Sequence, residues 1–395
     1  MQSKLKFTKH VIGQLANHTG NAQMNTFSAA GDINGDGRID FALCGRNGKM
    51  AWLENEGQER PWKLHFVADV ENQECGGCLV DLTGNGWLDI INGSDSSGNT
   101  ISWWENPGPV GGPWKQHLIA QTGATQFHDT LIADVTHDGC LSLIFDNQHD
   151  VNGTSIYRVP IPADPFVSPW PGLERITSAK SEPNPYHRWS EIKIQPEEGL
   201  AVGDIDQDGK NELVCGTHWY KFNQGVWEEH KFASGYITTK VAIGDVDGDG
   251  KNEIVLSEGD PYVYGRKAGG KLAWFKPGED LCAMWNEHLI EDHLLDPHSL
   301  VLADLCGNGH MDLFVGEVGA ADDATDAYVE RPPRLMIYEN DGSGNFMRHI
   351  IDEGTGTHEA MLMDVRQTGR LDIIGKPLHG PEKWNIHVWY NDSGR

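Results

Sequence analysis

A short acidic phrase recurs seven times along the chain, and an internal repeat of this kind constrains the fold more than any other sequence signal. Two copies are complete, with Asp at positions one, three and five, Gly at position six and Glu at position nine. These are Asp204, Asp206, Asp208 and Glu212, and Asp245, Asp247, Asp249 and Glu253. A third copy carries one amide, and its residues are Asp32, Asn34, Asp36 and Asp40. Four degenerate copies begin at Asp81, Asp134, Asp304 and Asp364.

Each phrase lies in a constant frame of short apolar runs. Residues 200–203 precede one complete phrase, residues 213–215 follow it, and two further runs complete the unit. Runs this short, bounded by Gly and Asp, are typical of β-strands rather than helices. Four strands in each of seven units predict an all-β fold, a seven-bladed β-propeller of four-stranded blades.

The two ends of the chain complement each other. The seventh unit has only three apolar runs after residue 357, and residues 7–12 match the sequence pattern of the fourth apolar run in the other units. We expect this N-terminal strand to complete the last blade, because that closes the ring and removes exposed strand edges. No linker interrupts the pattern, so residues 1–395 are predicted to form a single domain.

Composition excludes two classes of partner. The 58 acidic residues outnumber the 31 basic ones, for a formal charge of -27, whereas nucleic-acid binding requires a basic surface. No apolar run approaches the roughly 20 residues of a membrane span. Residues 1–17 lack the apolar core of a signal peptide. We therefore expect either a cytoplasmic protein or a secreted or periplasmic one whose signal has been removed, and slightly favour the second.

The acidic phrases are also sets of hard oxygen ligands. In a tight turn the side chains at positions one, three and five converge, and the acid at position nine completes a cage suited to Ca²⁺. We expect structural Ca²⁺ in the loops that begin at Asp204, Asp245 and Asp32. The loop at Asp364 places Arg366 at a ligand position and is expected to hold no metal. We interpret these ions as structural, stabilising the hairpins, rather than as catalytic.

The repeat resembles a known family. The acidic phrase with its flanking small and aliphatic strands is similar to the FG-GAP or VCBS (integrin-type) repeat of propellers, over nearly the entire chain. That family includes adhesion modules and carbohydrate-active lyases and dehydratases, among them propeller polysaccharide lyases. A looser resemblance is to the propeller domain of fungal aldos-2-ulose dehydratase. It is carried by Trp104, Glu105, Asn106 and Pro107, followed by Trp114, Lys115, Gln116 and His117, and by histidines in the first strands.

The face opposite the acidic loops carries the titratable residues. Six positions before each first aspartate the chain has, in order, Thr26, Cys75, His128, Glu198, Thr239, His298 and His358. This position begins the first strand of each unit, near the axis, so we expect the side chains to meet across a central pocket. The long connections around residues 177–195, 258–269 and 317–333 belong to the same face, where binding and catalysis usually reside.

The three histidines admit three interpretations. His128, His298 and His358 could hold a transition metal or a further Ca²⁺ ion as a second metal site. One of them could act as a general base. Alternatively, they are polar groups that satisfy strand ends around a water-filled channel.

Our leading hypothesis is a lyase or dehydratase that acts by β-elimination on a uronic-acid-containing glycan or a keto-sugar. Such a reaction needs a base, an acid and a positive group near the developing enolate. The candidate catalytic residues are His128, His298, His358, His218, Tyr186, Arg188, Arg46 and Lys240. The candidate substrate-binding residues are His149, Trp189, Trp219, Glu258, Glu317, Glu359 and His379. The expected partner is an oligo- or polysaccharide, with an anionic one included.

Two alternatives remain at this point. The first is a non-catalytic propeller that binds glycans or protein, because one fold hosts many functions. The second is a glycoside hydrolase, in which Glu198, Glu258, Glu317 and Glu359 would supply a carboxylate pair.

Overall fold

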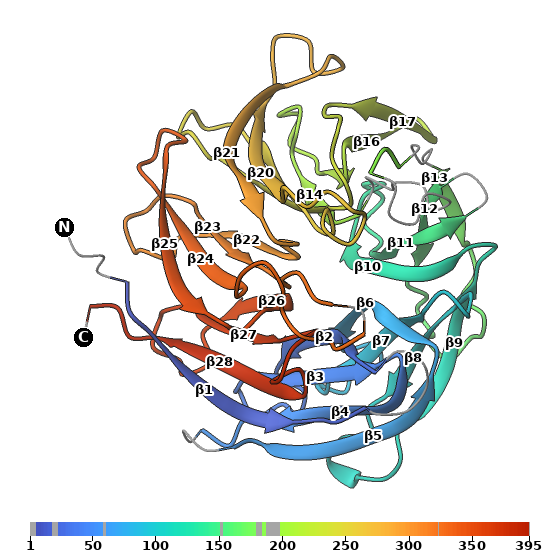
Figure 1. Cartoon of the computed structure of the whole chain (residues 1–395). Coiled ribbons are helices and arrows are strands. Elements are labelled where there is room, and N and C mark those ends of the chain that lie inside the picture. The colour runs from blue at the N-terminus through green and yellow to red at the C-terminus, as the bar shows by residue number, and fades with distance from the viewer. Residues whose placement is uncertain are drawn as a thin grey trace.

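The computed structural model describes residues 5–17, 23–57, 61–150, 153–178, 184–186, 198–322 and 324–394. These residues form seven antiparallel sheets of four strands each, arranged radially around a central axis (Figure 1). The predicted seven-bladed propeller is therefore confirmed. Within the described ranges, no helix has the length and hydrophobicity that crossing a membrane would require.

The blades follow one another along the chain, and the strands of each run from the axis outward. Blade 1 consists of β2 (Asn25–Gly31), β3 (Asp40–Gly45), β4 (Asn47–Glu54) and β5 (Lys63–Glu71). Blade 2 consists of β6 (Gln73–Val80), β7 (Asp89–Ser94), β8 (Thr100–Glu105) and β9 (Lys115–Gln121), with the short 3-10 helix η1 (Gly108–Val110) before β9. Blade 3 consists of β10 (Thr125–Ala133), β11 (Ser142–Asp150), β12 (Gly153–Pro160) and β13 (Glu174–Ser178).

The remaining blades repeat this order. Blade 4 consists of β14 (Leu200–Gly203), β15 (Glu212–Cys215), β16 (His218–Asn223) and β17 (Val226–Lys231). Blade 5 consists of β18 (Thr239–Gly244), β19 (Glu253–Glu258), β20 (Gly270–Lys276) and β21 (Asn286–Leu294). Blade 6 consists of β22 (Ser299–Ala303), β23 (Asp312–Gly316), β24 (Arg334–Asn340) and β25 (Phe346–Glu353). Blade 7 consists of β26 (His358–Met363), β27 (Asp372–Lys376), β28 (Asn385–Asn391) and β1 (Phe7–Gln14).

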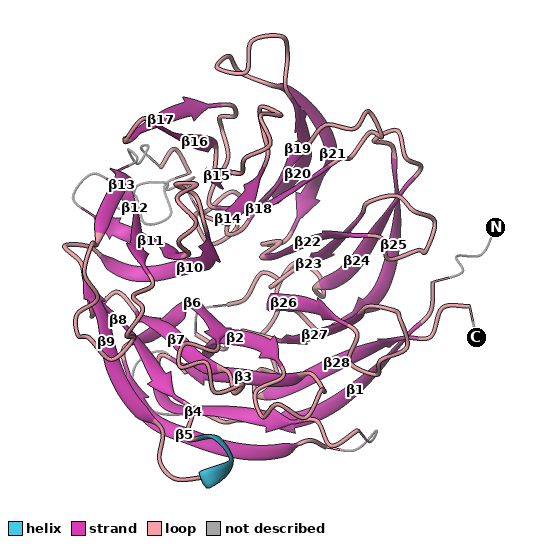
Figure 2. Cartoon of the chain, turned by 180° about the vertical axis from the view of Figure 1, so that it is seen from behind, coloured by secondary structure: helices cyan, strands magenta, loops and turns pink. Residues whose placement is uncertain are grey.

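The N-terminal strand closes the ring as expected. β1 pairs antiparallel with β28 from Phe7 opposite Asn391 to Gln14 opposite Asn385. Ile12 of β1 is buried in a core cluster with residues of blades 1 and 7. In the view from behind, the first and last strands run side by side at the rim (Figure 2), and the backbone N–H of Lys6 donates to the Ser393 hydroxyl at 3.0 Å. The final blade therefore depends on both ends of the sequence.

Neighbouring blades pack through a small residue that precedes the acidic loop. A Cβ atom on Gly203 would lie 2.7 Å from a methyl group of Ile243, and one on Gly244 would lie 2.6 Å from a methyl group of Leu302. Both distances are too short for a side chain without movement of the neighbour. Glycine at these positions allows the aliphatic side chain of the next blade to approach the backbone, which keeps the inner strands close to the axis.

A buried acid at position nine holds the acidic loop closed in every blade except the third, which has Ser142 there. Asp40 accepts the backbone N–H of Ile33 at 3.0 Å on one oxygen and that of Asn55 at 2.8 Å on the other. Asp89 and Asp312 make the same two bonds in blades 2 and 6. The side chain is fully buried, so these bonds satisfy N–H groups that would otherwise be costly.

The histidines of the outermost strands pack on the blades themselves. His65 stacks on Trp52 with ring centroids 4.2 Å apart, and His288 stacks on Trp274 at 3.9 Å. His117 and His230 stack in the same way on Trp103 and Trp219. These four imidazoles are parts of the outer packing and lie outside the central pocket, which is lined by other histidines.

Ile12→Ala should destabilise the propeller by about 2–4 kcal/mol, because it removes buried atoms from the strand that closes the ring. Val11→Ala is the matched control, since Val11 neighbours Ile12 and is 46% exposed. Urea unfolding followed by tryptophan fluorescence gives both free energies of unfolding. Equal losses for the two variants would contradict a closing role for β1.

Candidate functional site

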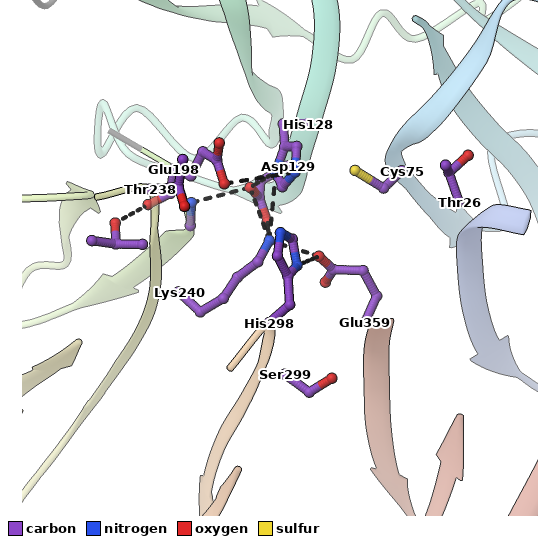
Figure 3. A network of polar contacts seen from close by, with 12 residues as sticks. Thr26, Cys75, His128, Asp129, Glu198, Thr238, Lys240, His298, Ser299 and Glu359 are labelled. Carbon is purple, nitrogen blue, oxygen red and sulfur yellow. Dashed lines mark hydrogen bonds and ion pairs between the residues drawn. The ribbon is translucent and has the colours of Figure 1, made fainter. Parts of the chain in front are cut away.

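The predicted ring of residues gathers around the propeller axis. The innermost strands carry four of them near their starts, namely Thr26, His128, Thr239 and His358. Glu198 and His298 lie just before β14 and β22. All of these side chains are buried, as is Cys75 of β6. Figure 3 shows His128, Glu198 and His298 pointing toward one another from three different blades. The strand geometry that the repeat imposes therefore concentrates titratable groups where the blades converge.

Two imidazoles and a carboxylate form one compact set. The Nε2 atom of His128 lies 3.6 Å from a carboxylate oxygen of Glu198, and the rings of His128 and His298 have centroids 5.3 Å apart. One ligand atom from each of His128, Glu198 and His298 lies within 4.8 Å of the others. Such a set of two histidines and one carboxylate suits a divalent transition metal and leaves coordination positions open.

The third histidine lies beside this set rather than in it. His358 stacks on His298 with ring centroids 4.4 Å apart. Its ligand atom is grouped instead with those of Cys75 and Glu359. Glu198 thus takes the place that the sequence analysis gave to His358, and the three imidazoles do not form one ligand set. Burial, with His298 and Lys376 nearby, holds the pKa of His358 well below its ordinary value.

A buried lysine connects three blades next to the histidines. The ammonium group of Lys240 in blade 5 lies 3.1 Å from Asp129 of blade 3 and 2.6 Å from Glu359 of blade 7 (Figure 3). Asp129 also accepts a hydrogen bond from the Nδ1 side of His128 at 2.7 Å, and Glu359 lies 3.2 Å from Nδ1 of His298. Carboxylates thus orient both rings of the candidate metal set, as is common in metal sites.

The electrostatics separate the buried carboxyl groups. Burial raises the pKa of Glu198 to about 7, despite opposing contributions from His128 and Lys240. Burial acts in the same direction on Asp129 and Glu359, but Lys240 and the neighbouring histidines together outweigh it and lower both pKa values, that of Glu359 to about 2. For His298, burial lowers the pKa while Asp260 raises it, and the result is about 9. A metal bound to His298 would therefore displace a proton.

The three histidines open onto a cavity of about 610 Å³. Its other lining residues include Arg46, Glu74, Asp260, Tyr264 and Lys383. This volume lies within the range of small-molecule pockets. The arrangement provides a cavity with imidazoles on its wall and carboxylates and an ammonium group in contact with them.

The structure brings some predicted site residues together. His128, His298, His358, Arg46, His149 and His379 line the cavity. Lys240 and Glu359 contact its imidazoles through the network described above. The Arg46 guanidinium pairs with Glu74 at 2.7 Å, and Nδ1 of His379 lies 2.7 Å from Asp326.

Other predicted residues lie elsewhere. Trp219 is buried in a blade core under His230, and His218 lies 3.9 Å from Glu229 of the outer strand β17. Glu258 pairs with Arg266, and Glu317 pairs with Arg331 at 2.6 Å, so both carboxylates serve the packing of the loops. Tyr186 is half-exposed beside Arg266 and does not line the cavity. Arg188 and Trp189 lie outside the described residues.

Several lining residues were not among the predicted site residues. Glu74 and Asp296 lie one and two positions before members of the ring, and Gln148 contacts Glu198 from the end of β11. Asp326 and Lys383 come from two loops that meet at the cavity, 2.7 Å apart. A count of positions just before each ring residue would have pointed to Glu74 and Asp296, whereas pairing between distant loops leaves no signal in a single sequence.

The acidic loops differ in their fitness for metal. Ligand atoms of Asp204, Asp206 and Glu212 converge in blade 4, and those of Asp245, Asp247 and Glu253 converge in blade 5. Both clusters are consistent with Ca²⁺ sites. The blade 1 loop is not among the convergent groups found in the described residues, and both oxygens of its Asp40 accept backbone N–H groups.

The comparisons with known proteins agree with this architecture. Residues 204–256 match the FG-GAP-like repeat. The chain is thus a seven-bladed propeller in which one segment matches the FG-GAP-like repeat, and no curated protein matches it in sequence.

Three solved structures are similar in fold. The exotype rhamnogalacturonan lyase YesX has a TM-score of 0.53 at 12% identity, over 98% of this chain and 76% of that one. The rhamnogalacturonan lyase YesW has a TM-score of 0.49 at 12% identity, over 97% and 75%. The V. cholerae biofilm matrix protein Bap1 has a TM-score of 0.48 at 10% identity, over 99% and 92%. At such identities the likeness to YesX concerns the fold alone.

Lys240→Met should destabilise the protein by about 3–5 kcal/mol, because Asp129 and Glu359 would lose their buried counter-ion. Adding Glu359→Gln should recover part of this loss by removing one of the two uncompensated charges. Lys49→Met, at an exposed strand position, is the control. Thermal and urea unfolding report the differences, and a double variant no more stable than the single one would contradict the network.

Proposed function

We propose that the protein is a metal-dependent carbohydrate lyase or dehydratase that performs a β-elimination in the central cavity. The observation that supports this most is the convergence of His128, Glu198 and His298, all buried, beside a cavity of small-molecule size. A buried set of this composition serves poorly as mere packing, because each unpaired polar group costs stability. The fold is shared with YesX, so a lyase site on this scaffold has precedent.

The metal in this proposal is a divalent transition metal held by His128, Glu198 and His298. The buried Oε2 atom of Glu198 makes no hydrogen bond, so this oxygen is available as a ligand for the metal ion. When bound, such an ion polarises a carbonyl oxygen as a Lewis acid. Asp129 and Glu359 keep the two imidazoles oriented through their Nδ1 atoms.

The elimination needs a base and an acid on this chain. His358 is the candidate base, because it lines the cavity and is not part of the metal set. It would take the proton from the carbon next to the carbonyl. The electrons of that C–H bond then form the new double bond as the β carbon–oxygen bond breaks. Tyr264 also lines the cavity, and burial raises the pKa of its phenol. This phenol is the candidate donor of a proton to the departing oxygen.

Charge favours a neutral keto-sugar over a uronate. Among the described residues that line the cavity, the two permanent cations are Arg46 and Lys383, and each is paired with a carboxylate at 2.7 Å. Asp260 and Asp322 add negative charge to the lining of the cavity. A substrate carboxylate would meet repulsion there unless the metal neutralised it, whereas hydroxyl and carbonyl groups would find donors and acceptors.

The two alternatives receive less support. Glu258 and Glu317, two of the acids considered for glycoside hydrolysis, are each paired with an arginine away from the cavity. A propeller that only binds glycans would not require the buried metal set. Tyr262 and Tyr264 beside the cavity would suit sugar stacking in either a binding protein or an enzyme.

We also propose Ca²⁺ as the ion of the acidic loops in blades 4 and 5, in a structural role. The Oε1 atoms of Glu212 and Glu253 are buried without a hydrogen bond, and so are Oδ1 of Asp204 and Oδ1 of Asp247. Hard carboxylate oxygens that converge in this way are the ligands Ca²⁺ prefers.

The protein should convert neutral keto-sugars into conjugated enones, which appear as a new ultraviolet absorbance. Uronic-acid polysaccharides, tested in parallel, should react more slowly or not at all. Elemental analysis of protein purified without chelator should find about one transition-metal ion per chain. Glu198→Ala and His298→Ala should lose this ion and at least about 100-fold in rate, in keeping with the weight of metal catalysis.

His293→Ala is the matched control, because His293 is exposed on an outer strand. His358→Ala should lose activity but keep the metal, which separates the base from the ligands. Wild-type protein that binds keto-sugars without turnover would instead identify a glycan-binding propeller. Full metal content in the Glu198→Ala variant would refute the assigned ligand set.

A further inference from the structure

The two acidic loops that gather metal ligands each receive a lysine from their own blade. Lys221 of β16 contacts Asp206, and its Nζ atom lies 2.7 Å from Asp208 and 3.8 Å from Oε1 of Glu212. Lys276 of β20 contacts Asp247, and its Nζ atom lies 2.8 Å from Asp249. In both blades the ammonium group thus engages the carboxylates at positions three and five of the loop.

The register of the blades explains why the lysines arrive there. Leu213 pairs with Tyr220, so Glu212 faces Lys221, and Ile254 pairs with Phe275, so Glu253 faces Lys276. The same position in blades 1, 2 and 6 is held by Glu54, Glu105 and Glu339. Each of these acids turns to the histidine of the outer strand, at 2.6, 3.1 and 2.8 Å. A lysine at this position is therefore confined, among the described blades, to the two loops with converging ligands.

The acid at position nine differs in the same two blades. In blades 1, 2 and 6 it is an aspartate whose two oxygens both accept backbone N–H groups. In blades 4 and 5 it is a longer glutamate that gives one oxygen to a backbone N–H, at 2.9 Å in both cases. The other oxygen is buried without a hydrogen bond. Glutamate at position nine and lysine on the third strand therefore occur together in these two loops, where one buried glutamate oxygen makes no hydrogen bond.

We infer that Lys221 and Lys276 are built-in counter-cations that share the carboxylates of these loops with a divalent ion, so that Ca²⁺ binds only by displacing them. This inference rests on the calcium assignment for its second half. In the absence of Ca²⁺ the ammonium group offsets the charge of the carboxylates that converge in each loop, which would otherwise repel one another. When Ca²⁺ is present, the same ammonium group must withdraw, which weakens binding of the ion. Blades 4 and 5 would then hold their shape with or without calcium.

Lys221→Met with Lys276→Met tests both halves. In EDTA, the double variant should melt several degrees below wild type, because the carboxylates lose their counter-ions. Isothermal titration should show Ca²⁺ binding tighter by about tenfold or more, since a competing charge within ion-pair distance is gone. The calcium-induced rise in melting temperature should correspondingly exceed that of wild type.

Lys210→Met with Lys251→Met is the matched control. These lysines follow Gly209 and Gly250 in the same two loops and are exposed. Their substitution removes the same charge from the same region. Lower stability in EDTA without any calcium binding, in wild type and variants alike, would remove the calcium assignment and leave the counter-cation role. Calcium affinity and EDTA stability that match the control pair would overturn the inference altogether.

Discussion

The propeller depends on a buried carboxylate that ends the acidic loop in six of the seven blades and accepts one or two backbone N–H groups from the adjoining segments. In blade 1, for example, Asp40 binds the amides of Ile33 and Asn55, which fixes the first, second and third strands relative to one another. Because one such residue returns in blade after blade, the inner strands start at the same height around the axis. That common height is what places His128, His298 and His358 on one cavity, although they come from blades 3, 6 and 7.

The two faces of the molecule use charge in opposite ways. On the loop face, carboxylates are exposed and meet cations from the same blade, such as Lys221 and Lys276. At the opposite end of the inner strands, buried acids from different blades meet one ammonium group, that of Lys240. Charges on the first face therefore stabilise single hairpins, whereas those on the second connect separate blades. A site that spans blades can change its chemistry without disturbing the repeat that builds each blade.

The sequence alone determined the fold because the repeat states it seven times, and the ring position followed from counting back to the strand starts. It did not reveal that Glu198 rather than His358 would accompany His128 and His298, because a count along the chain contains no distances. Nor did it show that Trp219 faces a blade core, because a strand residue faces either the core or solvent and the repeat does not distinguish the two. Contacts between loops, such as that of Asp326 with Lys383, depend on tertiary structure and leave no local pattern.

The pairing of the first strand with the last has a consequence for how the protein is made. Phe7 lies opposite Asn391, so β1 can pair only after the six intervening blades have been synthesised. Blades 1 to 6 contain only strands that are close in sequence, and such local pairing forms quickly. Blade 7 must wait, and until it closes, β1 and β28 each present an unpaired edge to the cell. The interval before closure is thus the period in which this chain is most exposed to mispairing with another copy.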